Sequence, residues 1–156
     1  MLDIAEKIQR LVLHEGCVLK PYRCPAGYLT IGVGRNLETN PLTEEEKRVC
    51  GDYKHGITRN AAYYLLRNDI ARVEKELRKK VPFYETLNDD RQYALLDMAF
   101  NLGLAGLLKF KKMLMAMATG YWEEAAKECL DSKYARDTGK RALRIAETIK
   151  TGRFKL

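Results

Sequence analysis

The chain has 156 residues, 46% of them hydrophobic, and its 28 Lys and Arg residues against 21 Asp and Glu give a net charge of +7. This length suffices to bury one core, and no apolar run reaches the roughly 18 residues of a membrane span, so we expect one compact unit without stable membrane insertion. The positive charge favours a polyanionic partner, either nucleic acid or an anionic bacterial envelope.

The cysteines and the N-terminal residues indicate in which cellular compartment the protein is made. The cysteines show no Cys-x-x-Cys or His-linked metal spacing; they are Cys17, Cys24, Cys50 and Cys129. We therefore expect free thiols, a reducing cytosol, and neither a metal nor an organic cofactor. The N-terminus lacks the basic start, apolar core and cleavage site of a signal peptide.

The first predicted element is a helix whose apolar residues follow a 3.6-residue period: Ile4, Ile8, Leu11 and Val12. Glu15 continues this stripe, and Gly16 is a stop signal. Partial burial and the negative end of the helix dipole would both raise the pKa of Glu15. A carboxylic acid that stays protonated near neutral pH can protonate a leaving oxygen.

The chain then changes to the period of a strand. Residues 28–33 alternate, with Leu29, Ile31 and Val33 on one face and Thr30 on the other. Turn residues in 24–27 join this strand to a short segment at 20–23, which predicts a hairpin.

The hairpin gives the candidate site its second and third groups. It would bring Cys24 and Thr30 close together. Gly32 and Gly34 leave one face of the strand bare, so an extended ligand could approach the backbone there.

The rest of the sequence predicts helices, which makes the fold class α+β and mostly helical. Thr43 is the predicted N-cap of a short helix that ends near Cys50, and Thr58 that of a long helix that ends at Lys80. The further predicted helices cover residues 88–102, 107–118, 122–131 and 139–151.

At its hairpin the chain resembles the phage-type lysozymes, the endolysin family of glycoside hydrolases. The family pattern is a Glu, eight residues, usually an Asp, five residues, then a Thr in a Tyr-x-Thr-x-Gly-x-Gly strand; Glu15, Cys24 and Thr30 occupy these positions, with Cys24 replacing the Asp. The resemblance implies that Glu15 is the general acid and that Cys24 and Thr30 hold the attacking water.

Two later segments, 99–103 and 140–154, are also similar to the family. Arg141 is similar to the arginine that pairs with the catalytic Glu, and Arg144 to one that pairs with an acidic residue, here replaced by His14. A cation beside Glu15 would lower its pKa, so the net direction stays open.

The resemblance also implies an architecture and a substrate site. Residues 1–156 would form one lysozyme domain, with a hairpin lobe at about 14–58, a connecting helix at about 59–80, and a helical lobe at about 81–156 plus the N-terminal helix. A glycan would be bound by four residues besides the catalytic ones: Gly32, Phe100, Asn101 and Tyr134.

The implied function is hydrolysis of the β-1,4 bond between N-acetylmuramic acid and N-acetylglucosamine in peptidoglycan. A monomeric endolysin would be made in the host cytoplasm and reach the wall through a separate holin-type membrane protein, with peptidoglycan strands as its partner and no nucleic acid.

Three alternatives stay open. Cys24 could orient water or, since a thiolate is a good nucleophile, attack the glycosyl carbon and form a covalent intermediate. A lytic transglycosylase would need only Glu15. A nucleic-acid-binding module is the competing class, but the sequence has no helix-turn-helix, zinc-finger or basic-zipper signature.

Overall fold

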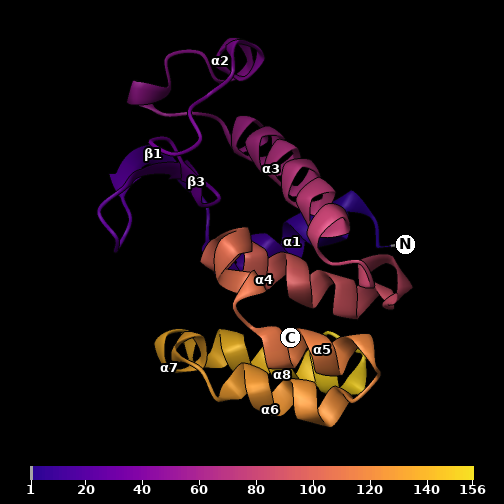
Figure 1. Ribbon diagram of the computed structural model, residues 1–156. Coiled ribbons are helices and arrows are strands. Elements are labelled where there is room, and N and C mark those ends of the chain that lie inside the picture. The colour runs from indigo at the N-terminus through magenta and orange to yellow at the C-terminus, as the bar shows by residue number, and fades with distance from the viewer. Residues whose placement is uncertain (1) are drawn as a thin grey trace. The chain divides into compact units, whose positions relative to one another are not determined.

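The computed structural model describes residues 2–156, so Met1 of the predicted domain lies outside the described residues. It confirms the α+β, mostly helical class (Figure 1). The elements in chain order are α1 (Ile4–Glu15), β1 (Val18–Arg23), β2 (Leu29–Gly32), β3 (Arg35–Asn36), α2 (Glu44–Cys50), η1 (Tyr53–His55), α3 (Arg59–Lys80), η2 (Tyr84–Thr86), α4 (Asp89–Leu108), α5 (Lys111–Ala118), α6 (Trp122–Leu130), α7 (Lys133–Thr138) and α8 (Lys140–Thr151).

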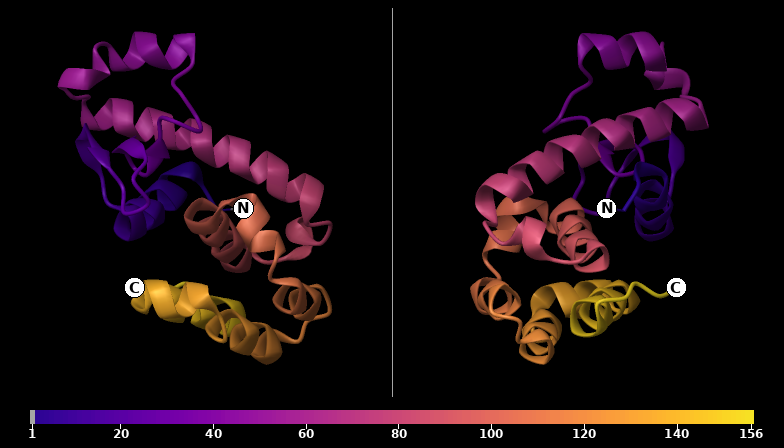
Figure 2. Two further views of the ribbon diagram at one scale, coloured as in Figure 1. Left: turned by 60° about the vertical axis from the view of Figure 1, so that its left-hand side comes forward. Right: turned by 90° about the vertical axis from the view of Figure 1, so that its right-hand side faces the viewer.

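Internal contacts divide the chain into two compact units. The N-terminal unit is Asp3–Ala71, and the C-terminal unit is Arg72–Leu156 with Leu2. The division falls within α3, which Figure 2 shows as one continuous helix. This grouping assigns α1 to the same unit as the hairpin, whereas we had assigned it to the helical lobe; the lobe boundaries stay a prediction.

Local capping explains where α1 begins and ends. The Asp3 side chain accepts the Glu6 N–H at 2.9 Å, which satisfies a donor of the first turn. At the other end Gly16 adopts φ 75°, and its N–H donates to the Val12 carbonyl at 2.8 Å. Glu15 is therefore fixed as the last residue of the helix.

The N-terminal unit contains an antiparallel sheet in the order β1-β2-β3. Thr30 lies on the central strand, opposite Tyr22 of β1 and Asn36 of β3. The predicted hairpin is confirmed. Strand β3 was missed because two residues are too few to show an alternation.

Buried apolar side chains of β2, α3 and the loops between them form the core of this unit. They are Ile31, Leu42, Ile57, Ala61, Ala62 and Leu65. The sheet that carries Thr30 is thus held against α3.

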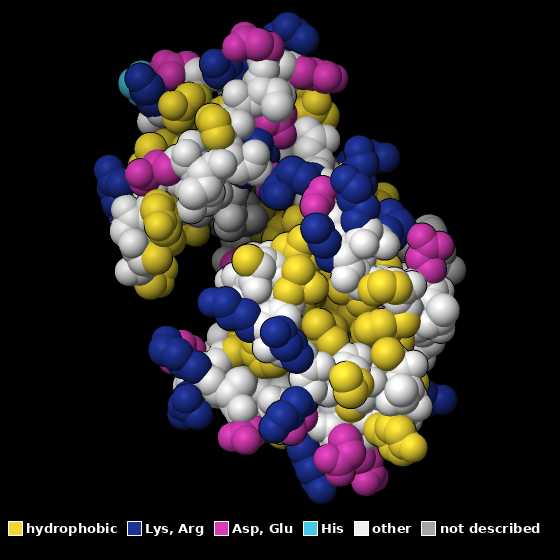
Figure 3. All heavy atoms as spheres, viewed as in Figure 1, with side chains coloured by type: hydrophobic (Ala, Val, Ile, Leu, Met, Phe, Trp, Pro, Cys, Tyr) yellow, Lys and Arg dark blue, Asp and Glu magenta, His cyan; other side chains and the backbone are white. Residues whose placement is uncertain are grey.

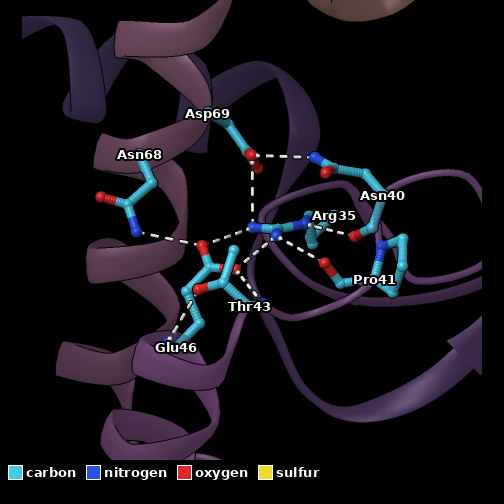
Figure 4. A network of polar contacts seen from close by, with 7 residues as sticks. All are labelled: Arg35, Asn40, Pro41, Thr43, Glu46, Asn68 and Asp69. Atoms are coloured by element: carbon cyan, nitrogen blue, oxygen red, sulfur yellow. Dashed lines mark hydrogen bonds and ion pairs between the residues drawn. The ribbon is translucent and has the colours of Figure 1, made fainter.

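A buried polar network braces the same unit (Figure 4). Arg35, only 3% exposed, donates to both carboxylate oxygens of Glu46, at 2.6 and 3.0 Å, and lies 3.2 Å from Asp69. Glu46 also closes the predicted capping box of α2 with Thr43. One cation therefore joins β3, α2 and α3.

The C-terminal unit is helical. Helix α6 packs on α8, α5 on α6, and α4 on α8. Helical geometry in α4 breaks at Gly103, φ 74° and ψ 159°, where we predicted an end, but a further turn continues to Leu108.

Two helix predictions were wrong in this unit. Helix α5 begins at Lys111 rather than 107, because tight turns at Lys109 and Phe110 end the preceding helix. Helix α7 was missed, although Ser132 caps it by accepting the Ala135 N–H at 3.1 Å.

Within residues 2–156, no single helix has the length and apolarity of a membrane span; α4 and α5 reach them only as a pair bent by 101°.

Candidate active site

Glu15 lies half-buried at the end of α1, against the turn between β2 and β3. A Cβ atom built on Gly34 would lie 3.3 Å from Oε2 of Glu15 and 3.5 Å from its Cδ. Gly34 has φ +70°. A glycine at this position therefore leaves the space that the Glu15 carboxyl occupies.

Cys24 begins the turn of the hairpin. Its N–H donates to the Tyr28 carbonyl at 2.9 Å, and the Gly27 N–H donates to the Cys24 carbonyl at 2.8 Å. Desolvation raises the pKa of the thiol, but hydrogen bonds from the Tyr28 and Ala26 backbone, the Thr30 hydroxyl and the Gly27 backbone outweigh it and lower the pKa below its usual value. The turn thus favours a thiolate.

Thr30 is buried, with 3% of its surface exposed. Its hydroxyl lies 2.9 Å from the Tyr28 carbonyl oxygen and also within hydrogen-bond reach of Cys24, so its single hydrogen can be donated to either acceptor. The sequence-based expectation that the hairpin brings Cys24 and Thr30 together is confirmed.

Tyr22 is the member of this cluster that the sequence did not reveal. Burial raises the pKa of its phenol, and the charges of Glu15 and Cys24 raise it further. The same side chain therefore lies within electrostatic reach of both groups. Its place on β1, directly across from Thr30, is the signal that could have found it.

Gly32 packs closely against α3, and its predicted role in ligand binding stays a prediction. It is buried, and a Cβ built on it would lie 3.4 Å from the Ala62 side chain. The missing side chain makes room for α3.

Three predicted substrate-binding residues lie in the C-terminal unit. In the last turns of α4 before the Gly103 break, Phe100 is half-buried and Asn101 is exposed. Tyr134 is only 4% exposed, and its ring packs edge-on against Phe110 at 6.1 Å. Tyr134 is therefore largely buried by packing within the C-terminal unit, and its glycan-binding role stays a prediction.

Arg141 is anchored by a carboxylate that the sequence did not single out. Its Nε lies 2.8 Å from Oδ1 of Asp97, which is fully buried, and the Tyr93 hydroxyl donates to Oδ2 of Asp97 at 2.7 Å. Arg144 and His14 are half-buried. The roles of all three basic residues toward Glu15 stay predictions.

Among residues 2–156, no group of three or more His, Cys, Asp and Glu side chains is arranged to hold a metal ion.

The sequence of this chain matches a known protein family. Residues 12–147 match the family described as phage lysozyme. The pre-baseplate central spike protein of Enterobacteria phage T4 is 34% identical over 97% of this chain, which spans only 28% of that protein.

Two further relatives match over most of their own length. A probable T4-type lysozyme of Dictyostelium discoideum is 32% identical, covering 91% of this chain and 92% of the relative. An endolysin of Acyrthosiphon pisum secondary endosymbiont phage 1 is 31% identical, covering 90% and 86%.

Proposed function

Since this chain belongs to the phage lysozyme family of peptidoglycan-lysing enzymes, we propose that it hydrolyses the β-1,4 bond between N-acetylmuramic acid and N-acetylglucosamine. Glu15 is the general acid, and Cys24 and Thr30 either position the attacking water or, in the case of Cys24, attack the glycosyl carbon. Glycoside hydrolysis requires an acid together with a base or a nucleophile. The carboxyl can serve as the acid, and the thiol beside the hydroxyl can serve as the base or the nucleophile.

One observation carries this proposal: the Glu15 carboxyl lies against the β2–β3 turn at Gly34, beside the sheet that contains Thr30 on β2 and that leads from β1 into the turn at Cys24. Tyr22, across from Thr30, senses the charges of both Glu15 and Cys24. These contacts support a single site for the three groups of the Glu-Cys-Thr pattern, which are spread over sixteen sequence positions.

The chemistry has two balanced routes. In the first, Glu15 gives its proton to the departing sugar oxygen while the Cys24 thiolate accepts a proton from water held by Thr30, and the anomeric centre inverts. In the second, the thiolate attacks the glycosyl carbon as Glu15 protonates the leaving group. Glu15 then takes a proton from the water that releases the sugar, and configuration is retained.

Digestion of purified peptidoglycan by the native protein and by Glu15→Gln tests the assignment. We expect the variant to lose about 10²–10⁴-fold in rate, the usual contribution of a positioned acid. The matched control is Glu44→Gln, an exposed carboxyl on α2, which should digest at the native rate. Equal rates for Glu15→Gln and the native protein would refute the role of Glu15.

Product analysis separates hydrolysis from the lytic transglycosylase alternative. Hydrolysis leaves a reducing N-acetylmuramic acid, whereas transglycosylation leaves an anhydro sugar lighter by one water. We expect the reducing product, because a buried hydroxyl and a low-pKa thiol beside the acid suit water activation. Anhydro ends alone would replace hydrolysis by transglycosylation.

Cys24→Ser and the anomer of the first product distinguish the two routes. An inverted anomer with no mass adduct supports water activation by Cys24. A retained anomer with a glycosyl adduct on native Cys24 supports the nucleophilic route. Full activity of Cys24→Ser would remove the thiol from the mechanism.

The remaining parts of the proposal concern substrate and setting. Asn101, which is exposed, and Phe100 are the better glycan-binding candidates of the C-terminal unit. We further propose that the protein acts as a monomer and reaches the wall from the host cytoplasm with the help of a holin-type membrane protein.

The family match favours the wall-lysing function over the nucleic-acid-binding alternative. The family match covers residues 12–147, which include nearly every element of the fold. On the face shown in Figure 3, Lys and Arg side chains lie among acidic and apolar ones.

A further inference from the structure

Positive charge is divided unequally between the two units. Residues 2–71, which hold the Glu15 cluster, carry ten Lys and Arg against nine Asp and Glu, whereas residues 72–156 carry eighteen against twelve. The last seventeen residues, 140–156, carry six against one. The excess charge of the protein therefore concentrates on α8 and the tail that follows it.

The tail is held in a defined course. Gly152 ends α8 with φ +78°, and its carbonyl accepts the Asn88 Nδ2–H at 3.0 Å. A Cβ on Gly152 would lie 2.9 Å from that same Nδ2 and 3.2 Å from Cζ of Arg91. Only glycine fits both the backbone angle and the close approach, so the chain turns here against the start of α4.

Phe154 is the second anchor of the tail. Its N–H donates to Oδ2 of Asp90 at 2.9 Å, and its ring lies edge-on to Tyr93 with centroids 5.1 Å apart. Neighbouring side chains of an extended segment point in opposite directions. With Phe154 held by α4, Arg153 and Lys155 are exposed, and both line a surface hollow together with α8.

This hollow has a volume of about 350 Å³ and an unusual charge. Its lining includes the cations Lys140, Arg144, Arg153 and Lys155, but only one carboxylate, Glu147. In two other hollows on the same unit, the numbers of cationic and acidic side chains are nearly equal. One has three lysines against Glu128 and Asp131, and the other has two lysines against two glutamates.

We propose that α8 and the tail form a binding site for a phosphodiester polymer attached to the bacterial cell wall. The proposal rests on the proposed function, since it gives a wall-lysing enzyme a second contact with the wall. The Glu15 cluster would cleave the glycan while the hollow holds the polyanion that accompanies it.

The charge pattern selects this ligand class. Lys140, Arg153 and Lys155 line one hollow with a single carboxylate, and a polymer with a phosphate in every repeat would place several negative charges beside them. Arg and Lys both bind phosphate oxygens, Arg through its planar fork. Such binding releases counterions and must weaken steeply with salt.

Retention on purified walls tests the proposal. All variants are made in the Glu15→Gln background, so that walls are not digested during binding. The probe variant is Arg153→Gln/Lys155→Gln. Its matched control is Lys75→Gln/Lys79→Gln, which removes the same charge from exposed positions of α3 in the same unit. Each protein is titrated onto walls that carry their phosphodiester polymer and onto the same walls stripped of it.

We expect the probe variant to bind native walls about tenfold or more weakly than its parent at low salt, with a shallower salt dependence. The control should bind within about twofold of the parent. Stripping the polymer should abolish the difference between parent and probe variant. The charge-keeping change Arg153→Lys/Lys155→Arg should restore retention, and matching melting curves would show that the tail change leaves the fold intact.

Other results would overturn the proposal. Equal losses for probe and control would mean that net charge alone drives adsorption. Undiminished retention of the parent on stripped walls would assign the attraction to carboxylates of the peptidoglycan itself. A Glu15→Gln protein that still digests walls would instead refute the proposed function and leave the binding result to stand separately.

Discussion

At the scale of single residues, the candidate site depends on one close approach. Because Gly34 has no side chain, it leaves space for the Glu15 carboxyl, and backbone N–H groups of the hairpin turn donate hydrogen bonds to the Cys24 sulfur. Each arrangement depends on a few atoms of the backbone or of a glycine. Both can therefore be tested by changes of a few atoms.

Gly34→Ala should reduce activity more than stability. An added methyl group would meet Oε2 of Glu15 at 3.3 Å and displace the carboxyl, and misplacement of a catalytic group by up to 1 Å costs as much as about 10²-fold in rate. Gly51→Ala is the control, since Gly51 has φ +67° and an added Cβ would meet nothing within 4 Å.

Both variants place an alanine at a positive φ, which costs on the order of 1–3 kcal/mol, so both should melt at a lower temperature than the native protein. Wall digestion by Gly34→Ala should be about tenfold or more slower, whereas Gly51→Ala should digest at the native rate. If the two variants lost activity in parallel, the contact with Glu15 would have no catalytic meaning.

Thiol alkylation should distinguish the cysteines, all four of which are free. The lowered pKa of Cys24 gives it a larger thiolate fraction at any pH below that pKa. Burial raises the pKa of Cys129 to about 12, and its side chain has no exposed surface. Peptide mass mapping after timed iodoacetamide treatment at neutral pH should find Cys24 labelled first and Cys129 last; the reverse order would contradict the thiolate assignment.

At the scale of elements, a few polar contacts fix how the strands and helices of the N-terminal unit meet. Arg35 on β3 joins α2 through Glu46 and α3 through Asp69. Burial alone would raise the pKa of Glu46, but hydrogen bonds from Arg35, Asn68 and the Thr43 backbone, with the Arg35 charge, lower it to about 2. The ionised form of Glu46 is thus stabilised by folding.

Glu46→Gln should destabilise the protein in a pH-dependent way. Glutamine keeps the capping box of α2 but leaves the buried Arg35 without its full counter-charge, a change that usually costs about 3–5 kcal/mol. Urea unfolding near pH 7 should show the loss, and Glu44→Gln, exposed on the same helix, should show little.

The pH dependence follows from linkage. Because the folded pKa of Glu46 is about 2 and the unfolded value is about 4.3, its ionisation contributes about 3 kcal/mol above pH 5, and this is lost as the pH falls toward 2. The stability gap between native protein and Glu46→Gln should therefore narrow on acidification. A gap that stays constant from pH 7 to pH 3 would contradict the role of the charge.

At the scale of the whole molecule, charge is distributed unequally between the two units. The unit with the candidate catalytic groups is nearly neutral, and the unit that ends in α8 carries most of the excess positive charge. A neutral glycosidic bond gains little from long-range attraction, whereas adsorption to an anionic wall gains much.

Salt should therefore slow wall digestion more than cleavage of a short soluble glycan without anionic polymer. Raising the ionic strength from 0.01 M to 0.15 M shortens the Debye length from about 30 Å to about 8 Å. We expect initial digestion rates on whole walls to fall on the order of tenfold while the soluble reaction changes far less. Parallel losses on both substrates would place the salt effect on the catalytic unit.

Although β3 and α7 were missed, sequence patterns predicted several local features of this chain correctly, because each of these features depends on residues close in the chain. The helix stop at Gly16, the hairpin at 24–27, the capping box at Thr43 and the break at Gly103 are all set by backbone preference and neighbouring hydrogen bonds. The resemblance to the phage lysozymes rested on the same short-range spacing around Glu15 and is confirmed by the family match.

What the tertiary structure alone decided are the contacts between distant segments. No local pattern shows that Gly32 packs on Ala62, that Tyr134 is buried, or that Asp97 holds Arg141, because each depends on which surfaces meet after folding. Burial changes the role that a residue type suggests, so the sequence determined which chemistry the chain carries, and the packing determined which side chains remain free to perform it.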